Sequence, residues 1–298
     1  MKRDFLQLAD FSLQEHRALL ARAKELKARR RQRLLDETLK GRTLALVFEK
    51  PSTRTRVSFE AAMVQLGGSA IVIGGADSQI SRGETIEDTA RVISRYVDCI
   101  MFRTFGDDRL QAFARASSVP VINGLSNGAH PVQLLADLMT VEERLGSVEG
   151  KKVAFVGDAA SNMALSWIEA GRLFGFEVVL GAPAPYRPAP DQLQGVKVFD
   201  RASEAAAGAD VIATDVWTSM GQEAEAKERL RRLDGFIVDE ALVARAKPHC
   251  VVLHCLPAHR GEEISAGVID ATGSAVWDEA ENRMHAQKAL LEMLMTWA

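Results

Sequence analysis

Apolar residues follow two alternating patterns along most of the chain. Short runs rich in Val, Ile, Leu and Phe, which are typical of buried strands, precede longer segments in which apolar residues recur at helical spacing. The first series predicts strands at residues 43–48, 70–73, 99–102 and 119–122, and helices at residues 55–66, 85–97, 110–116 and 131–145. A regular alternation of strand and helix predicts a parallel sheet with helices on both faces.

A second series starts after Gly150 and predicts strands at residues 153–156, 177–180, 196–199, 211–214 and 250–254. Since 298 residues are enough for two hydrophobic cores, we expect an α/β fold of two domains, each a mainly parallel sheet with helices on both faces. We expect the first domain at residues 1–145 and the second at residues 146–280. A last helix, at about residues 281–298, is expected to complete the first domain.

Residues 12–37 have the pattern of an amphipathic helix, and Ser12 with Glu15 is typical of a capping box at its start. The basic run at residues 29–33 is compatible with a nucleic-acid patch or with a solvated helix end. The second interpretation is favoured, because cations are stabilised near a helix C-terminus. The net charge of −3, from 37 basic and 40 acidic residues, gives no general affinity for polyanions, so we expect no nucleic-acid partner.

Three cysteines, an odd number at wide spacing, fit neither a disulfide framework nor a zinc site. This usage is typical of a reducing compartment, so we expect a cytoplasmic protein. The N-terminal residues lack the apolar core of a signal peptide, and no apolar run is long enough to span a bilayer. We therefore expect a soluble enzyme without a membrane partner.

The segment Ser52-Thr53-Arg54-Thr55-Arg56 lies between a predicted buried strand and a helix. Unpaired backbone N–H groups at the helix start, hydroxyls and guanidinium groups all favour a phosphate dianion. Hydroxyl residues alone would indicate a helix cap, but two arginines among three hydroxyls favour the phosphate. The segment is not a glycine-rich nucleotide loop, and residues 157–162 lack the repeated glycines of a dinucleotide fingerprint, so we expect no cofactor.

Other polar residues follow predicted strands of the first domain, where open α/β sheets bind ligands. Arg103 comes directly after the strand at residues 99–102, and its alternative role is that of a surface salt-bridge arginine. His130 precedes Pro131, which is suited to a first helical turn, so His130 and Gln133 should both lie at that helix start. The alternative for His130 is a capping histidine.

The second domain offers two further segments. Asp215 follows an apolar strand and, with Ser219, has the chemistry to hold a ligand ammonium group; the alternative is a turn closed by Asp and Gly. Cys255 ends another strand, and the alternative for a lone, partly buried cysteine is packing. A zinc site of His254, Cys255 and His259 lacks a fourth ligand, so we expect no metal.

Taken together, these segments resemble the carbamoyltransferase family over nearly the whole chain and in the same order. The Ser-Thr-Arg-Thr-Arg and His-Pro-x-Gln segments are shared by its aspartate and ornithine members, and they imply carbamoyl phosphate as the first substrate. The acceptor segments resemble those of the ornithine members: Asp215 with Ser219-Met220-Gly221, His254-Cys255-Leu256-Pro257, and Asp278 through Arg283.

The resemblance implies a role for each candidate residue. Those implied for carbamoyl phosphate are Ser52, Thr53, Arg54, Thr55, Arg103, His130, Gln133, Cys255, Leu256 and Arg283. Those implied for ornithine are Asn162, Asp215, Ser219 and Met220. Four are implied in catalysis: Arg103, His130, Asp215 and Cys255. Gln79, in the segment at residues 77–84, is implied to reach the site of a neighbouring subunit in a homotrimer or a multiple of trimers.

The resemblance implies transfer of a carbamoyl group from carbamoyl phosphate to the δ-amine of L-ornithine, giving L-citrulline and phosphate, a reaction of arginine biosynthesis and urea cycle chemistry. The first domain would then bind carbamoyl phosphate and the second ornithine. Two alternatives stay within the family: another acceptor, such as putrescine or an N-acylated ornithine, and a non-catalytic subunit with the same fold. A third is a phosphorylated-ligand binding protein of unrelated function.

Overall fold

The computed structural model describes residues 2–75, 78–218 and 223–296. The chain divides into two compact units. Unit 1 is formed by Met1–Met139 with Asn282–Ala298, and unit 2 by Thr140–Glu281. Each unit contains one parallel sheet with helices around it, which confirms the predicted fold class.

Unit 1 contains a four-stranded sheet in the order β2-β1-β3-β4, with every neighbouring pair parallel. Its strands are β1 (Thr43–Phe48), β2 (Ser69–Ile73), β3 (Cys99–Arg103) and β4 (Val121–Leu125). Its helical segments are η1 (Leu8–Asp10), α1 (Leu13–Arg31), α2 (Thr53–Gln65), η2 (Gln79–Arg82), α3 (Ile86–Ile93) and α4 (Asp107–Ala116). Two further helices, α5 (Pro131–Leu145) and α11 (Val276–Thr296), run across the boundary between the units in sequence.

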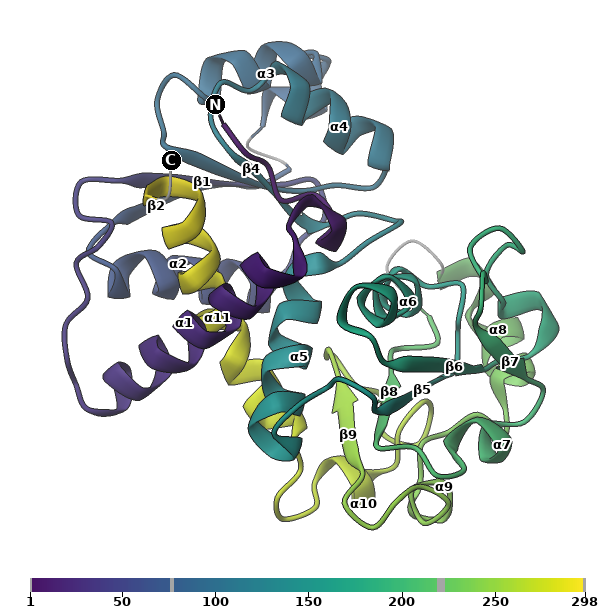
Figure 1. Ribbon diagram of the computed structural model, residues 1–298. Coiled ribbons are helices and arrows are strands. Elements are labelled where there is room, and N and C mark those ends of the chain that lie inside the picture. The colour runs from purple at the N-terminus through teal and green to yellow at the C-terminus, as the bar shows by residue number, and fades with distance from the viewer. Residues whose placement is uncertain (1, 76–77, 219–222, 297–298) are drawn as a thin grey trace. The chain divides into compact units, whose positions relative to one another are not determined.

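The core of unit 1 follows from the alternation of side chains along its strands. Val47 of β1 and Phe102 of β3 lie in one apolar cluster with residues of α3 and α4, and the Phe102 and Phe113 rings stack at 4.5 Å. Figure 1 shows α3 and α4 on one face of this sheet and α2 on the other, with α1 and the C-terminal part of α11 on the same side as α2. Apolar residues on both strand faces are buried, as the unbroken apolar runs predict.

Unit 2 contains a five-stranded parallel sheet in the order β7-β6-β5-β8-β9. Its strands are β5 (Lys152–Val156), β6 (Glu177–Gly181), β7 (Lys197–Phe199), β8 (Val211–Thr214) and β9 (Val251–His254). Its helical segments are α6 (Asn162–Phe174), η3 (Ala184–Tyr186), α7 (Ala202–Ala206), η4 (Glu223–Glu225), α8 (Ala226–Leu233), α9 (Glu240–Val243) and α10 (Ala266–Ile269).

One face of the second sheet packs on an apolar cluster that includes Val156 and Ile212 of the strands and residues of α7, α8, α9 and α10. Trp167 of α6 is not part of that cluster and meets the Phe176 ring edge-on at 6.0 Å. No helix among the described residues combines the length and the apolar character needed to cross a membrane.

The strand orders place a topological switch point in each sheet. In unit 1 the chain moves from β1 to β2 on one side and from β3 to β4 on the other, so the switch point lies between β1 and β3. In unit 2 the equivalent position lies between β5 and β8. Open α/β sheets bind ligands beyond the carboxyl ends of the strands at such points. Ser52 and Arg103 lie there in unit 1, and Asp215 lies there in unit 2.

The two largest differences from the predicted helix boundaries lie in the first and the last helix. The first helix ends at Arg31 instead of residue 37, because Arg33 adopts a left-handed conformation with φ of 58°. Its N–H donates to the Arg30 carbonyl and the Leu34 N–H donates to the Arg29 carbonyl, which is a Schellman ending without the usual glycine. The last helix begins at Val276 instead of residue 281, with Asp278 and Glu279 in its first turn, where acidic groups are stabilised. The predicted capping box of Ser12 and Glu15 is confirmed.

Candidate functional site

Ser52 caps α2 directly beyond β1. Its Oγ accepts from the Thr55 N–H at 3.4 Å and donates to Thr55 Oγ1 at 3.0 Å. Thr53 is the first residue of the helix and is exposed. The first turn of α2 therefore lies at the surface, among hydroxyl side chains. Such a helix start is suited to an anion.

A hydrogen-bonded chain joins the start of α2 to the start of α5 through Arg283 of α11. Arg283 Nη2 donates to Thr55 Oγ1 at 3.0 Å, and Arg283 Nη1 donates to Gln133 Oε1. Gln133 Nε2 donates in turn to Asp137 Oδ1 at 2.7 Å. Since Thr55 Oγ1 accepts from both Ser52 and Arg283, the Thr55 hydroxyl proton remains available as a donor. Residues far apart in sequence are thereby brought into one polar cluster.

Arg103 ends β3, pairs in register with Phe48 of β1, and is 7% exposed. Its Nη1 donates to the Gly124 carbonyl at 3.3 Å. Lys50 approaches the same place from the β1 end, and burial together with the nearby Arg103 charge lowers the pKa of its ammonium group. Lys50 Nζ donates to Asn127 Oδ1 at 2.9 Å and lies 4.3 Å from the centroid of the Phe105 ring.

His130 is buried at the start of α5. Burial is the main cause that holds the pKa of its imidazole well below the ordinary value of 6.5, and the charges of Arg283 and Arg103 add to it. His130 is therefore neutral at pH 7, in a surrounding of two guanidinium groups. A neutral imidazole still donates one hydrogen bond, so His130 has the form needed to stabilise an oxyanion.

The remaining candidates of unit 1 differ in their surroundings. Arg54 is half-buried, and neither Arg54 nor Lys50 makes an ion pair with any residue that the structure describes. Arg56, two positions later, is exposed and donates to Glu60 at 3.2 Å. Gln79 is exposed at the start of η2, while Asp77, at the start of its segment, lies outside the described residues.

In unit 2 the structure brings Asp215 and Cys255 together from the ends of β8 and β9. Cys255 Sγ donates to Asp215 Oδ1 at 3.1 Å, and the Val216 N–H donates to the same oxygen at 2.7 Å. Burial is the main cause that raises the pKa of the Asp215 carboxyl, while His254 and the hydrogen bond from Cys255 act in the opposite direction. A partly shielded carboxylate of this kind is suited to an ammonium group.

The turn after Cys255 is held by a buried histidine. The Leu256 N–H donates to His254 Nδ1 at 2.9 Å, so the ring proton is on Nε2, which faces Glu263 Oε1 at 3.1 Å. Leu256 has a φ of 59°, a left-handed conformation that costs energy for a side chain of its type and is found where the surroundings enforce it. The His254 contact provides that constraint and orients the peptide groups of Cys255 and Leu256.

Asn162 is the first residue of α6, half-buried, beyond the carboxyl end of β5. Beside it, the loop after β5 is fixed by an ion pair between Asp158 and the buried Arg229, whose Nε donates to the Trp217 carbonyl at 2.5 Å. Gly157 has a φ of 122°, and a Cβ there would lie 3.3 Å from Trp217 Nε1, so glycine is required. Ser219 and Met220 lie outside the described residues.

Two groups of described side chains have the ligand types of a metal site. The first is Asp215, His254 and Cys255, but the Cys255 thiol donates to Asp215 and both ring nitrogens of His254 have hydrogen-bond partners. The second is His259, Glu262 and Glu263, and Glu263 is engaged by His254 and by the His259 N–H at 2.5 Å. Binding a metal would break these contacts, so neither group favours an ion.

Sequence reasoning did not assign Lys50 or the cluster behind it. Glu49 accepts two hydrogen bonds from Arg109 and one from Thr104, and its N–H donates to the Arg103 carbonyl at 2.9 Å. This cluster fixes the adjoining ends of β1 and β3, between which the candidate anion site lies. The available signal was the run Glu49-Lys50 between an apolar strand and the hydroxyl segment.

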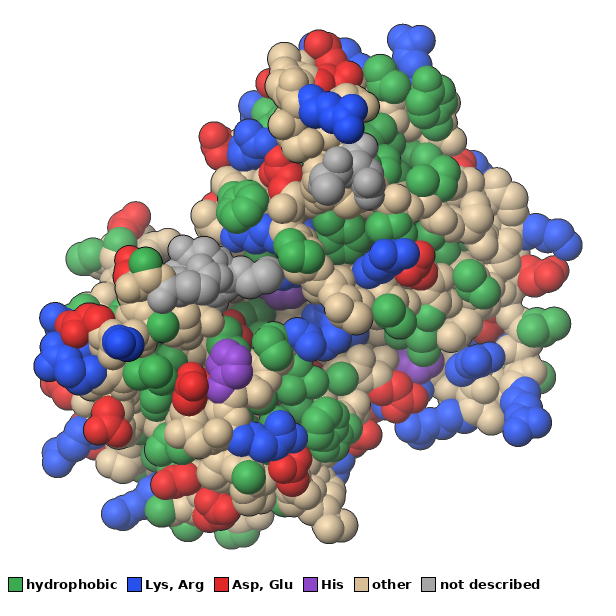
Figure 2. Space-filling view, turned by 180° about the vertical axis from the view of Figure 1, so that it is seen from behind, with side chains coloured by type: hydrophobic (Ala, Val, Ile, Leu, Met, Phe, Trp, Pro, Cys, Tyr) green, Lys and Arg blue, Asp and Glu red, His purple; other side chains and the backbone are tan. Residues whose placement is uncertain are grey.

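The charges of the two sites indicate ligands of opposite sign. The site of unit 1 contains Lys50, Arg54, Arg103 and Arg283 around a helix start, which is chemistry suited to a phosphate ester or anhydride. The site of unit 2 contains Asp215 beside a thiol. On the face of the molecule shown in Figure 2, acidic and basic side chains are interspersed, so charge separation is a property of the sites rather than of this surface.

Two family models match the chain in succession. The carbamoyl-P binding domain of the aspartate/ornithine carbamoyltransferases matches residues 3–143, and the Asp/Orn binding domain of the same family matches residues 149–294.

Individual relatives agree with these matches. An ornithine carbamoyltransferase of Halorhodospira halophila is 54% identical over 297 residues, covering 98% of this chain and 99% of the relative. An ornithine carbamoyltransferase of Acinetobacter baylyi is 52% identical over 297 residues, with coverages of 98% and 97%. Among solved structures, the ornithine carbamoyltransferase of Pyrococcus furiosus is similar with a TM-score of 0.94 and 47% identity, covering 99% of this chain and 97% of that one.

Proposed function

The chain belongs to the aspartate/ornithine carbamoyltransferase family, and we propose that it transfers the carbamoyl group of carbamoyl phosphate to the δ-amine of L-ornithine, giving L-citrulline and phosphate. Relatives about 50% identical over nearly the whole chain carry the name ornithine carbamoyltransferase, which favours ornithine over putrescine or an N-acylated ornithine as acceptor.

The observation that carries this proposal is the polar cluster of unit 1. Ser52, Thr55, Arg283 and Gln133 form one hydrogen-bonded chain at the start of α2. We assign Ser52, Thr53, Arg54 and Thr55 to the phosphate, and Arg103 to both the phosphate and the carbonyl oxygen. Gln133 and Arg283 are assigned to the carbamoyl end.

The reaction begins when the uncharged δ-amine attacks the carbonyl carbon, which places negative charge on the carbonyl oxygen. We propose that Arg103, His130 and Thr55 donate hydrogen bonds to this oxygen. The neutral state of His130 and the available hydroxyl proton of Thr55 support these roles. The tetrahedral intermediate then expels phosphate, while the attacking nitrogen loses one proton to the departing phosphate or to water. The cations of unit 1 stabilise the charge of the phosphate.

We assign the ornithine residues to unit 2. Asp215 would bind an ammonium group of ornithine, and its partly shielded carboxylate supports this role. Asn162, at the start of α6, would contact the ornithine carboxylate, and Ser219 and Met220 would orient the substrate. Cys255 would lie near the attacking amine, and the backbone carbonyls of Cys255 and Leu256, oriented through His254, would accept from the carbamoyl NH₂ group. The reaction transfers no electrons, and we propose no cofactor or metal.

We propose a cytoplasmic homotrimer, or a multiple of trimers, that acts in arginine metabolism. Three free cysteines support a reducing compartment. The exposure of Gln79 at the start of η2 supports its proposed contact with carbamoyl phosphate in a neighbouring subunit.

A panel of acceptors tests the reaction. Purified protein is given carbamoyl phosphate with L-ornithine, putrescine or N-acetyl-L-ornithine, and the carbamoylated product and phosphate are quantified. We expect kcat/KM to be highest for L-ornithine, with citrulline and phosphate formed in equal amounts. Faster turnover of putrescine or N-acetyl-L-ornithine would overturn the acceptor, and no turnover with any acceptor would favour a non-catalytic subunit.

A further inference from the structure

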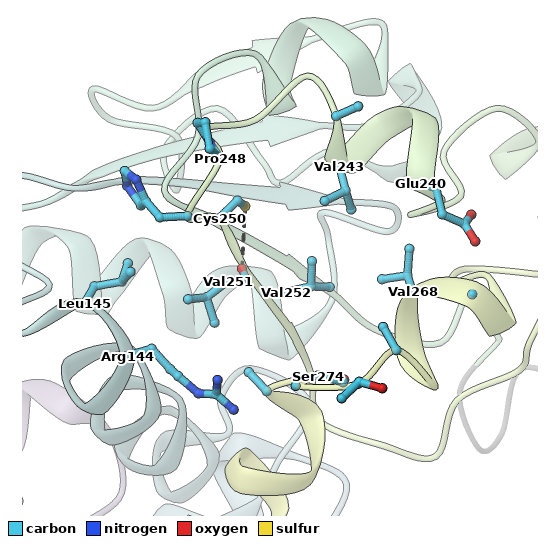
Figure 3. Close-up of a pocket in the computed structure, with 17 residues that line it drawn as sticks. Arg144, Leu145, Glu240, Val243, Pro248, Cys250, Val251, Val252, Val268 and Ser274 are labelled. Atoms are coloured by element: carbon cyan, nitrogen blue, oxygen red, sulfur yellow. Dashed lines mark hydrogen bonds between the residues drawn. The ribbon is translucent and has the colours of Figure 1, made fainter.

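A pocket of about 640 Å³ lies within unit 2 beside the amino-terminal half of β9. Figure 3 shows Arg144 and Leu145 on one side, Glu240 and Val268 on the other, and Val252 of β9 between them. The residues proposed for ornithine follow the carboxyl ends of β5, β8 and β9, so this pocket is a separate feature. Its volume is within the range of small-molecule sites, about 300–1,000 Å³.

The floor of the pocket is the open edge of a sheet. β9 is the last strand in the order, and the Val251 N–H donates to the Asp210 carbonyl at 3.0 Å, on the side of β8. Because alternate residues of a strand face alternate neighbours, Val252 directs its N–H and C=O outward. The next outward N–H, that of His254, is satisfied by Glu279 Oε2 at 2.8 Å. The Val252 backbone groups have no such partner among the residues described.

The walls of the pocket are aliphatic. Leu145, Val243, Val252 and Val268 are half-buried, and Ala244 is exposed at the rim. Val243 and Val268 also pack against the apolar cluster of unit 2, so they are held in place from behind. Burying such side chains under a ligand stabilises the complex, by a free energy of about 25 cal/mol for each Å² of apolar surface removed from water. A ligand with an aliphatic group of moderate size would make these contacts.

Opposite charges on the two sides of the pocket determine the orientation of a charged ligand. Arg144 Nη2 pairs with Asp278 Oδ2 at 2.5 Å, but a guanidinium has five N–H donors, so this pair leaves others for a ligand carboxylate. Across the pocket, Glu240 accepts from Ser265 Oγ at 3.0 Å and lies against Gly267, where a Cβ would be 1.6 Å from Glu240 Oε1. A ligand carboxylate is therefore attracted to the Arg144 side and repelled from the Glu240 side.

We propose that this pocket binds a small aliphatic carboxylate that carries an amide, as in an N-acylated aliphatic amino acid. The carboxylate would pair with Arg144, the amide would exchange hydrogen bonds with the Val252 backbone, and the aliphatic side chain would lie among Leu145, Val243 and Val268. The site is independent of the proposed carbamoyl transfer.

Calorimetric titration of the full chain with N-acetyl-L-leucine tests the site. Arg144→Gln should weaken binding by about tenfold or more, since it removes a charge-assisted hydrogen bond. N-acetyl-L-leucinamide, which lacks the carboxylate, should show a similar loss, and Ala244→Phe should abolish binding by filling the rim. Arg260→Gln is the matched control, because Arg260 also forms a half-exposed ion pair in unit 2, with Asp270, outside the pocket.

The ornithine residues provide the second arm of the test. Saturating L-ornithine should leave the affinity for N-acetyl-L-leucine unchanged, and both Arg144→Gln and Ala244→Phe should retain citrulline formation. If Ala244→Phe does not fold, the proposal is still tested by the surface change Arg144→Gln and by N-acetyl-L-leucinamide. Competition by ornithine, equal binding to Arg144→Gln and to Arg260→Gln, or no binding to the unmodified protein would each overturn the proposal.

Discussion

The two sheets offer the same topological position to ligands of opposite charge. Beyond the switch point of unit 1 lie Arg54, Arg103 and the buried Lys50, around a helix start. Beyond the switch point of unit 2 lies Asp215, beside the thiol of Cys255. The parallel α/β layout accounts for where each site lies, and the side chains after the strands account for what each binds. This difference supports the proposal that carbamoyl phosphate binds to unit 1 and the amine to unit 2.

The two sites also differ in how they are held together. In unit 1, Arg283 connects Thr55 of α2 with Gln133 of α5, so residues from three helices fix one another. In unit 2, Asp215 and Cys255 are fixed by local contacts at the ends of two adjacent strands. Changes in unit 1 should therefore affect several donors at once, whereas changes in unit 2 should affect mainly the acceptor.

The largest effect is expected from Arg103→Ala. This change removes the cation that we assign to the phosphate and a donor that we assign to the oxyanion, and losing one such donor typically lowers the rate by about 10²–10³. We expect the rate of citrulline formation to fall by about 10³ with the fold intact. Arg91→Ala, at an exposed arginine of unit 1 that pairs with Asp88, is the control and should keep its activity. Comparable loss in both variants would contradict the role of Arg103.

A smaller effect, confined to one substrate, is expected from Asp215→Asn. The change keeps the shape but removes the charge that we assign to an ornithine ammonium group, so kcat/KM for ornithine should fall by about tenfold to a hundredfold. The KM for carbamoyl phosphate should stay near its original value. A matching increase of that KM would show that the two sites do not divide the substrates by charge.

The rate should rise with pH through the neutral range. The δ-ammonium of ornithine has a pKa of about 10, so its reactive neutral form increases about tenfold for each pH unit below that value. His130 does not oppose this rise, because its lowered pKa keeps it neutral throughout. Steady-state rates from about pH 6 to about pH 9 check the prediction. A flat profile would mean that deprotonation of the amine does not limit the rate.

The buried histidines of unit 1 predict a loss of stability in acid. Burial lowers the pKa of His130 and of His16, so the unfolded chain binds more protons than the folded chain at a pH below the ordinary value of 6.5. Stability contributed in this way is complete above pH 6.5 and decreases as the pH falls, by at most about 1.4 kcal/mol per pH unit for each histidine. The free energy of unfolding, measured with a denaturant at pH 7.5 and at pH 5.5, tests this prediction. His16→Gln should reduce the difference between the two values.

The smallest effect is expected from Arg56→Ala, within the same segment as the phosphate residues. Arg56 is exposed and pairs with Glu60, and such surface pairs contribute about 0–1 kcal/mol. Activity should change by less than about twofold, and stability by less than about 0.5 kcal/mol. A large loss of carbamoyl phosphate affinity would mean that Arg56 turns toward the substrate.

The strands were predictable because buried parallel strands require unbroken apolar runs. Residues 43–48 and 211–214 were predicted with the bounds that β1 and β8 have. The end of α1 was missed because Arg33 takes a left-handed conformation that sequence normally signals with glycine or asparagine. The local sequence shows where a helix ends only when the residue at the turn is of a type that favours the left-handed conformation.

The candidate site was predictable where chemistry is concentrated in short segments. Ser52 to Thr55 stand together in sequence, and the structure shows why Ser52 caps the helix. Lys50 was missed because its burial depends on Phe105 and Asn127, which no local pattern connects to it. The contact of Arg283 with Thr55 joins residues 228 positions apart and was not predicted; resemblance to a family implied only that Arg283 serves the same ligand.

Calorimetric titration of carbamoyl phosphate into three forms of the protein tests the division of charge most directly. The unmodified chain and Asp215→Asn should bind carbamoyl phosphate with the same dissociation constant. Arg54→Ala, which removes a cation that has no ion pair among the described residues, should weaken binding by about tenfold or more. Equal loss in Arg54→Ala and Asp215→Asn, or no loss in Arg54→Ala, would contradict the assignment of carbamoyl phosphate to unit 1.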